Sequence, residues 1–427
     1  MPQKKWTILG QNPDVLLAMW ANLLSWFIST FFPSLLSQLL PSCDQEDTSP
    51  STLDQTQCIS IGRPGGLEQL RLITLKPRMC TKGYNLKNGT PFIAIDQVPT
   101  KECLVVRNHA FSVNYADCAI RWGLYESAKT FVGWPIVPGF DFAGTVERAF
   151  GDFQRGDRVF GCSLFGAYST RIAIPALQVR QIPSRLSFAQ AAALPAVSLT
   201  ALYALSLAGH DPNRPTNHRN KAILIHSCAG GVGSMLVQMS KLLGLRPIVG
   251  VVGRSSKVHA AKALGCDVVI DYSTQDLWTA VETASPNGYF TIMDANGVST
   301  LQQSYNHLCP TGRVVVFGFH SNLPLGRAIL SPLEWIRMGM KMSAMPKFDP
   351  MDLVVSNKAV LGFNLSFFAE EKELVAQLFD QVCHWLEQGL LECPQIVEME
   401  MEHIGEAHDL IMSGKSIGKI VLTVNPR

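Results

Sequence analysis

A glycine-rich segment at residues 228–233, with the sequence CAGGVG, contains residue types that can bind dinucleotide phosphates. It follows an apolar stretch at residues 222–226 and precedes a segment of helical character. Glycines let the backbone approach a pyrophosphate, and a helix start adds N–H donors and positive potential. Cys228 replaces the first glycine of the usual G-x-G-x-x-G pattern, but the flanking strand and helix supply the required context. We predict that Ala229, Gly230, Gly231, Val232 and Gly233 contact the phosphates of a dinucleotide, with a ligand-free tight turn as the alternative. A bound nicotinamide dinucleotide would give the protein hydride-transfer chemistry.

The residues after the second predicted strand, 247–252, indicate which dinucleotide binds. An acid there would bind the ribose 2′-hydroxyl of NADH and repel the 2′-phosphate of NADPH. No acid is present, and Arg254, Ser255 and Lys257 offer cations and a hydroxyl that suit a phosphate. We therefore predict NADPH as the cofactor. The alternative is that Arg254 and Lys257 are ordinary solvated residues at a helix start.

Other candidate residues follow later strands, where an open α/β sheet places its ligand. Tyr272, after the third predicted strand, is expected to stack beside the adenosine, or else to be a surface aromatic. Two late strands end at residues expected near the other end of the cofactor, namely Phe317, Gly318, Gly362, Phe363 and Asn364.

The elements that must position these residues are predicted from Ser187 onward, where apolar runs alternate with helical segments. This alternation predicts a doubly wound parallel sheet with right-handed crossovers. The predicted strands are 222–226, 247–252, 268–271, 291–294, 313–318 and 359–365, with helices beginning near Gly233, Ser256 and Ser299. A capping box at 187–190, a helix at 370–389 and a strand at 418–424 complete the pattern. Residues 67–183, with short apolar runs between Gly, Pro and Asp, predict a strand-rich part.

The N-terminal residues 15–40 contain no charge and exceed the roughly 20 apolar residues that cross a bilayer. Polar residues and Pro33 interrupt this run, and its large apolar side chains fall on one side at helical spacing. We expect a helix on the cytosolic face of a membrane; a spanning helix and a disordered extension are the alternatives. Residues 42–64, rich in Ser, Thr, Asp, Gln, Pro and Gly, predict a linker.

The composition excludes other classes of function and compartment. With 427 residues, 47% of them hydrophobic and 16% charged, the chain fits a well-buried protein of two domains plus an extension. A net charge of +2 and the lack of a long basic block argue against nucleic acid as a partner. The 11 cysteines include no C-x-x-C pair, which is typical of reduced thiols in the cytoplasm.

From about residue 65 to residue 425 the chain resembles the medium-chain dehydrogenase/reductase superfamily, and within it the quinone oxidoreductase branch. The motifs that carry this resemblance occur in the expected order: the segment around Asn114, 138–139, 156–159, 191–195, the glycine-rich turn, 263–267 and 418–419. The long stretch after Phe319 and residues 357–365 are similar to the vesicle amine transport protein homologues.

The resemblance implies the domain organisation. It indicates a GroES-like catalytic domain from 65–190 and 367–427 and a Rossmann domain from 191–366, after an N-terminal extension at 1–64. It also implies a homodimer.

The resemblance further implies zinc-free chemistry. Zinc-dependent relatives place a Cys and a Gly-His-Glu where this chain has Asn114 and residues 139–141, Gly-Phe-Asp. We therefore expect neither a catalytic nor a structural zinc. The expected reaction is hydride transfer from NADPH to a quinone or an enone, whose electron-poor double bond needs little activation.

Two residues are candidates for the hydride end. Tyr125 matches the tyrosine that enoyl reductases of the superfamily are thought to use as proton donor; its alternative is a structural aromatic. Asn114 resembles a residue near the nicotinamide, with a loop hydrogen bond as the alternative. Two other functions stay open: an enoyl thioester reductase, and a membrane-associated trafficking or lipid-handling protein with little turnover.

Overall fold

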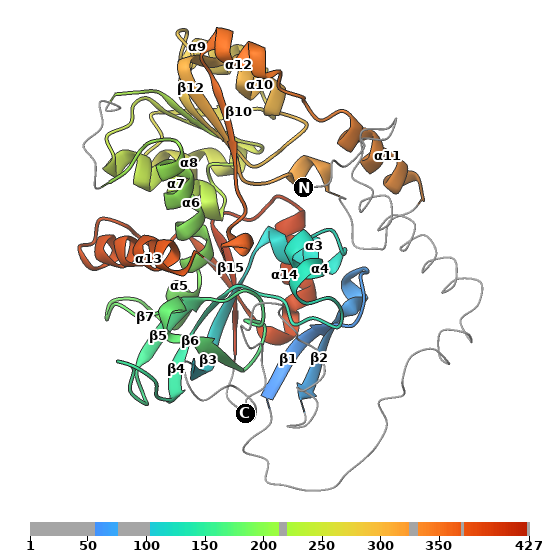
Figure 1. Cartoon of the computed structure of the whole chain (residues 1–427), viewed down its shortest axis with the longest axis vertical. Coiled ribbons are helices and arrows are strands. Elements are labelled where there is room, and N and C mark those ends of the chain that lie inside the picture. The colour runs from blue at the N-terminus through green and yellow to red at the C-terminus, as the bar shows by residue number, and fades with distance from the viewer. Residues whose placement is uncertain (1–55, 76–102, 213–219, 324–331, 369–370, 425–427) are drawn as a thin grey trace, which may run out of the picture.

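The computed structural model describes residues 56–75, 103–212, 220–323, 332–368 and 371–424. The predicted membrane helix at 15–40 lies outside these ranges. The described helices include none long and apolar enough to cross a membrane. Figure 1 shows two lobes, each built on a sheet, with helices between and around them.

The predicted doubly wound sheet is confirmed. Its six strands are parallel in the order β10-β9-β8-β11-β12-β13. Ile223 and Ile225 of the central strand face one apolar core, and Leu224 between them faces another, as period-two alternation requires. The strands are β8 (Ile223–Ile225), β9 (Ile248–Val252), β10 (Val268–Asp271), β11 (Tyr289–Asp294), β12 (Leu308–Val316) and β13 (Ala359–Gly362).

Helices follow these strands and cover both faces of the sheet. One core contains residues of α6 and α7, and the opposite core contains residues of α9 and α10. The helices of this part are α6 (Pro195–Leu207), α7 (Gly231–Leu242), α8 (Val258–Leu264), α9 (Leu277–Ala284), α10 (Leu301–Asn306), α11 (Pro332–Ser343) and α12 (Pro350–Ser356).

A second sheet of seven strands forms the strand-rich part. Its strand order is β14-β15-β3-β4-β5-β7, and β6 also pairs with β3. The C-terminal strand β15 runs antiparallel to β3, so the chain returns to this sheet after the parallel one. The strands are β3 (Cys103–Val113), β4 (Asp141–Arg148), β5 (Arg158–Cys162), β6 (Arg171–Pro175), β7 (Val179–Gln181), β14 (Ile396–Glu400) and β15 (Lys419–Thr423).

Further helices surround this second sheet. The predicted capping box is confirmed at the start of α5, where the side chains of Ser187 and Gln190 each accept from the other's backbone N–H. The α-helices are α3 (Tyr115–Arg121), α4 (Glu126–Phe131), α5 (Phe188–Ala192), α13 (Lys372–Glu387) and α14 (Ile404–Met412). Short 3-10 helices are η1 (Leu67–Gln69), η3 (Ala176–Gln178), η4 (Ser255–Lys257), η5 (His320–Asn322), η6 (Leu365–Phe367) and η7 (Met401–His403).

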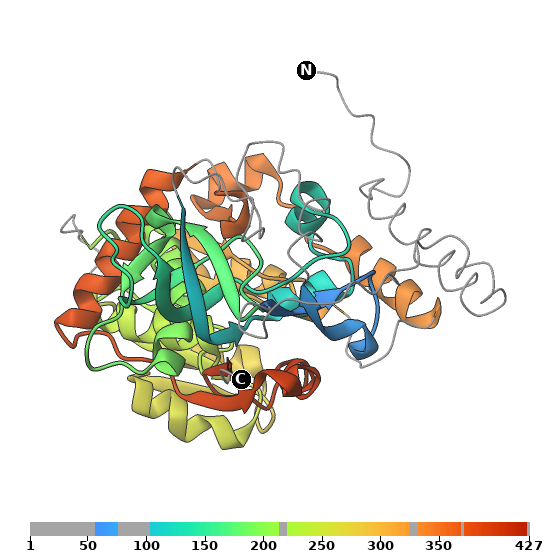
Figure 2. The same ribbon diagram turned by 90° about the horizontal axis from the view of Figure 1, so that it is seen from below.

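Part of the predicted linker is a strand. β1 (Thr56–Ile61) pairs with β2 (Leu70–Leu75) in a two-stranded sheet beside the seven-stranded one, as Figure 2 shows. Cys58 and Ile61 are fully buried, so the ordered fold begins before Gly65. The burial of this strand depends on distant partners, since Ile61 exchanges backbone hydrogen bonds with Ile136.

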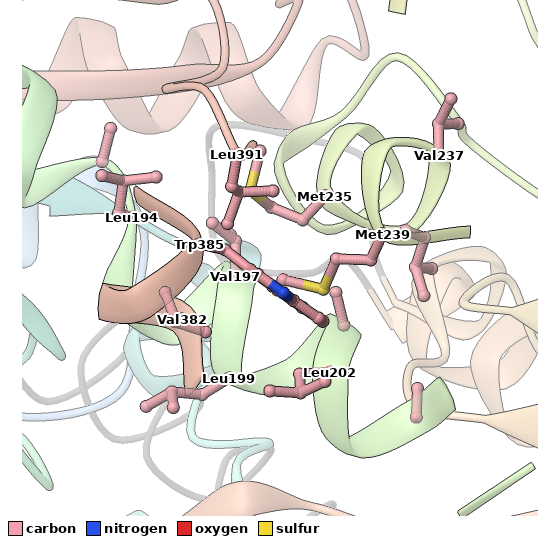
Figure 3. Packing of buried hydrophobic residues seen from close by; sticks show 14 of the residues in the cluster. Leu194, Val197, Leu199, Leu202, Met235, Val237, Met239, Val382, Trp385 and Leu391 are labelled. Atoms are coloured by element: carbon pink, nitrogen blue, oxygen red, sulfur yellow. The ribbon is translucent and has the colours of Figure 1, made fainter. Parts of the chain in front are cut away.

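Helix α6 joins the two halves of the molecule. Its side chains are apolar on almost every side, and it packs against both α7 and α13. Figure 3 shows Leu202 of α6 near Trp385 of α13 and Met239 of α7. The same core includes Phe160 of the seven-stranded sheet and Ile223 of the six-stranded sheet. One continuous apolar core therefore connects the two sheets.

Candidate functional site

A cleft of about 1330 Å³ lies where the two sheets meet. Residues that follow all six parallel strands line it: Ser227 after β8, Gly253 after β9, Tyr272 after β10, Asn296 after β11, Phe317 after β12 and Phe363 after β13. The opposite wall contains residues of the strand-rich part, among them Asn114, Tyr125 and Phe140. Ligand sites of open α/β sheets form at this carboxyl edge.

The glycine-rich turn forms part of the cleft wall, and all five predicted phosphate residues line the cleft. Helix α7 begins here, with Gly230 as its N-cap. A Cβ at Gly233 would lie 2.3 Å from the carbonyl oxygen of Ser227, so only glycine lets the helix pack so closely on the turn. The turn is thus a backbone cradle at a helix N-terminus, which suits a pyrophosphate.

Two predicted cations belong to the cleft wall. Arg254 and Lys257 both line it, and the Arg254 guanidinium donates to the carbonyl oxygen of Ser413 at 3.1 Å. Burial, and then the charge of Arg254, lowers the pKa of Lys257. Holding the positive charges of Arg254 and Lys257 near each other costs energy, and an anionic ligand would relieve that cost.

Tyr272 is an exposed aromatic residue of the cleft. It lines the cleft and remains 54% exposed, so one face of the ring is accessible to a ligand. Its hydroxyl would be 2.6 Å from a Cβ at Gly253, so a residue without a side chain fits directly after β9.

Ser255 does not line the cleft. Its hydroxyl donates to Oδ2 of Asp271 at 2.5 Å, and the hydroxyl of Ser273 donates to Oδ1 at 2.6 Å. These hydrogen bonds, from Ser255 first and Ser273 second, lower the pKa of Asp271. The prediction of NADPH rests on the lack of an acid directly after β9. Asp271 is an acid at the end of the neighbouring strand β10, which that prediction does not take into account.

The amide of Asn114 is held from both sides. Its Nδ2 donates to Asp141 Oδ2 at 2.8 Å, and its Oδ1 accepts from Lys419 Nζ at 2.7 Å. Its backbone N–H donates to Asp117 Oδ2 at 2.8 Å, which caps α3. Burial raises the pKa of Asp117 to about 7. Asn114 therefore belongs to a rigid polar cluster in the cleft wall.

Tyr125 and Asn364, which are 239 positions apart in the chain, meet in the cleft. The tyrosine hydroxyl donates to Asn364 Oδ1 at 3.1 Å and lies 2.9 Å from Ser366 Oγ. Burial raises the pKa of Tyr125, while its ring packs edge-on against Phe140. The group is a neutral hydroxyl that can donate a proton and has a second hydroxyl beside it.

The remaining predicted residues divide into two groups. Phe317, Gly318 and Phe363 line the cleft, whereas Gly362 does not. A Cβ at Gly318 would lie 2.9 Å from the carbonyl oxygen of Ala295, so the backbone after β12 passes close to that after β11.

Lys419 was not predicted as a site residue, although it lines the cleft. The available signal was a charged residue at the start of an otherwise apolar strand, KIVLT. Its side chain is only 4% exposed, and a buried lysine needs partners.

Within the described ranges, no three His, Cys, Asp or Glu side chains are grouped so that they could hold a metal ion. Asn114 and Asp141 both contact the Lys419 ammonium.

Comparisons with known proteins match most of this chain. The family model of the alcohol dehydrogenase GroES-like domain matches residues 100–184, and that of zinc-binding dehydrogenases matches residues 231–381. The human synaptic vesicle membrane protein VAT-1 homolog is 30% identical over 330 residues, covering 76% of this chain and 79% of its own.

Two enzymes are also similar. A 2-haloacrylate reductase from Burkholderia sp is 30% identical over 328 residues, covering 75% of this chain and 89% of its own. The crystal structure of a quinone oxidoreductase from Pseudomonas syringae pv. Tomato DC3000 has a TM-score of 0.67 and 26% identity, covering 86% of this chain and 99% of that one.

Proposed function

Because this chain belongs to the medium-chain dehydrogenase/reductase superfamily, in the quinone oxidoreductase branch near the VAT-1 homologues, we propose that it reduces a quinone or an enone with NADPH and without zinc. Membership makes it an oxidoreductase with a nicotinamide cofactor. One observation carries the finer proposal. The glycine-rich turn at residues 229–233, which we call the phosphate turn, lines the same cleft as the two cations, Asn114 and Tyr125.

The cofactor would lie along this cleft. Residues 229–233 would hold its pyrophosphate, because the glycines leave the backbone donors accessible. Arg254 and Lys257 would bind the 2′-phosphate, and Tyr272 would stack beside the adenosine. When bound, NADPH supplies the hydride. Asn114 would border the nicotinamide end of the cleft.

Tyr125 is our candidate for the proton donor. Its raised pKa keeps the hydroxyl protonated, and Ser366 and Asn364 hold it by hydrogen bonds. A neutral donor suits an enone, because hydride addition leaves negative charge that a proton must neutralise. A quinone accepts a hydride in the same way and gains its proton on oxygen.

The acceptor class rests on the chemistry of the site and of a relative. The wall near Tyr125 contains apolar side chains, including Leu124, Phe140 and Phe165. Such a wall suits a flat, electron-poor acceptor that needs little electrostatic activation. A 2-haloacrylate, the substrate in the name of one relative, has a double bond conjugated to a carboxylate.

A kinetic assay separates this proposal from its two alternatives. Purified protein and NADPH are mixed with quinones, enals and enoyl thioesters in turn, and NADPH oxidation is followed by absorbance. We expect turnover with quinones or enals. Turnover confined to thioesters would identify an enoyl thioester reductase.

The second alternative is favoured by the relative named a synaptic vesicle membrane protein. NADPH binding without turnover on any acceptor would support a trafficking or lipid-handling protein. Failure to bind NADPH would contradict the proposed cofactor.

We also propose a cytoplasmic homodimer whose residues 15–40 lie on a membrane surface. Sedimentation equilibrium tests the dimer. Carbonate extraction tests the membrane contact, because an interfacial helix is released and a spanning helix is retained.

A further inference from the structure

A buried lysine lies between the phosphate turn and the hydride end of the cleft. The Nζ of Lys419 donates to the carbonyl oxygen of Val113 at 3.1 Å and to Asn114 Oδ1 at 2.7 Å. Its third partner is Asp141 Oδ2 at 3.3 Å. The three ammonium hydrogens therefore match three protein oxygens, which leaves none for a ligand.

The partner Asp141 is itself fully buried and surrounded by donors. Its Oδ2 accepts from Ser112 Oγ at 2.7 Å and from Asn114 Nδ2 at 2.8 Å, and its Oδ1 accepts from the backbone N–H of Ala196 at 2.6 Å. The oxygen of the Asn114 amide is thus held by Lys419 and its nitrogen by Asp141. This arrangement fixes one orientation of the amide.

The same lysine contacts the phosphate turn. A Cβ at Gly231 would lie 2.8 Å from Cδ of Lys419, so glycine at this position makes room for the lysine stem. Next to the lysine, the backbone N–H of Gly418 donates to the carbonyl oxygen of Ala229 at 2.8 Å. The C-terminal strand is therefore attached directly to the turn.

We propose that Lys419 is a positioning residue that couples the phosphate turn to the orientation of Asn114. Its stem supports the turn at Gly231, and its ammonium holds the amide at the other end of the cofactor path. Movement of the turn on cofactor binding is then transmitted to the hydride end through one side chain. This inference rests on the proposed function.

The first test is Lys419→Met, which keeps a stem of similar length and removes the charge. We expect kcat to fall about 100-fold, because a displacement of about 1 Å can cost that much. The dissociation constant for NADPH, measured by fluorescence titration, is expected to stay within about 3-fold, since the stem still supports the turn. Lys415→Met changes an exposed lysine of the same tail and should match the wild type in both measurements.

A second variant separates positioning from stability. Lys419→Met leaves Asp141 as an unpaired buried charge, whereas Lys419→Met with Asp141→Asn removes both charges. We expect the double variant to regain the wild-type denaturation midpoint and to keep its NADPH affinity, while kcat stays low. Recovery of kcat together with the midpoint would show that the pair only stabilises the fold, and would overturn the inference.

Hydrogen exchange supplies a readout that does not need turnover. In the wild type, NADPH should slow exchange in residues 229–233 and also in residues 113–118. In the double variant, the first protection should persist and the second should disappear. Equal protection in both proteins would overturn the coupling and leave the proposed function intact, whereas a wild type that binds no NADPH overturns both.

Discussion

At the scale of single residues, the hydroxyl of Tyr125 stands where α4 and η6 approach each other in the cleft. Tyr125→Phe removes this hydroxyl and keeps the ring against Phe140. We expect kcat with an enone to fall about 100-fold or more, because general acids contribute at least that much. Affinity for NADPH should not change. Stopped-flow kinetics with the same enone measures both quantities.

The pH profile adds a second check on Tyr125. The ordinary pKa of tyrosine is about 10, and burial raises the pKa of Tyr125 above it. Ionisation of this tyrosine should therefore not reduce the wild-type rate at any pH below about 10. Tyr203→Phe is a control, since that ring packs on Phe363 and Phe368 and is not part of the cleft wall. A Tyr125→Phe enzyme as fast as the wild type would mean that solvent supplies the proton.

The cations Arg254 and Lys257 should determine cofactor choice. In the proposed binding mode, the double change to Ala removes two charge-assisted contacts to the 2′-phosphate, each contributing about 1.5–3 kcal/mol. NADPH affinity is expected to fall at least about 100-fold, with a much smaller change for NADH. Lys262→Ala, an exposed lysine on α8, is the matched control. Equal losses for both cofactors would contradict this assignment.

At the scale of elements, local patterns predicted most of the parallel sheet. β10 has the bounds expected from the sequence, 268–271, because an apolar run stands between polar residues. The composition of residues 42–64 predicts a linker, which includes the six residues of β1, TQCISI. These residues form a strand because they pair with β2, later in the chain. Hydrophobic periodicity and turn residues identify elements whose signal is local, and they miss elements that depend on distant partners.

The candidate site shows the same limit. The phosphate turn has a local signature, so all of its predicted residues line the cleft. The contacts of Lys419 with Asn114 and Asp141 span 305 and 278 positions, and no local pattern predicts them. The position of Asp271 against Ser255 likewise depends on the pairing of β10 with β9.

Helix α14 carries a buried histidine that should affect stability at acid pH. Nδ1 of His408 lies 3.5 Å from Cys118 Sγ, and Nε2 lies 3.3 Å from the hydroxyl of Tyr168. Burial, and then the charge of Arg121, lowers its pKa from 6.5 to about 3. As pH falls below 6.5 the unfolded chain binds a proton that the folded chain does not, so stability is lost between these two values.

Asp117 opposes this trend, because its pKa is raised to about 7 and the folded chain binds its proton first. The effect of His408 is therefore measured as a difference between wild type and His408→Gln. Between pH 7 and pH 5 the wild type should lose about 2 kcal/mol more of its unfolding free energy than the variant. Urea titrations at the two pH values measure this, with the exposed His259→Gln as control. Parallel pH dependence in wild type and His408→Gln would show that this imidazole does not titrate differently on unfolding.

At the scale of the whole molecule, the cleft depends on the relative position of two sheets that different stretches of chain build. The C-terminal strand β15 joins the seven-stranded sheet, and Gly418, directly before it, contacts the turn that follows β8. Helix α6 adds a continuous apolar core between the same two parts. Both connections hold the cleft wall that contains Tyr125 opposite the phosphate turn. The site therefore exists only while the two sheets are packed together.

Leu202→Ala tests whether the two sheets unfold as one unit. Leu202 is 1% exposed in α6, in the core that contains Phe160 of one sheet and Ile223 of the other. The change should lower the unfolding free energy by about 2–5 kcal/mol, as expected for a cavity in a packed core. Because the core is shared, amides of β3 and β9 should lose hydrogen-exchange protection to a similar extent. Leu390→Ala, at a half-exposed site, should cost less than about 0.5 kcal/mol. Loss of protection confined to β9 would mean that the sheets unfold separately and that α6 stabilises only the nucleotide side.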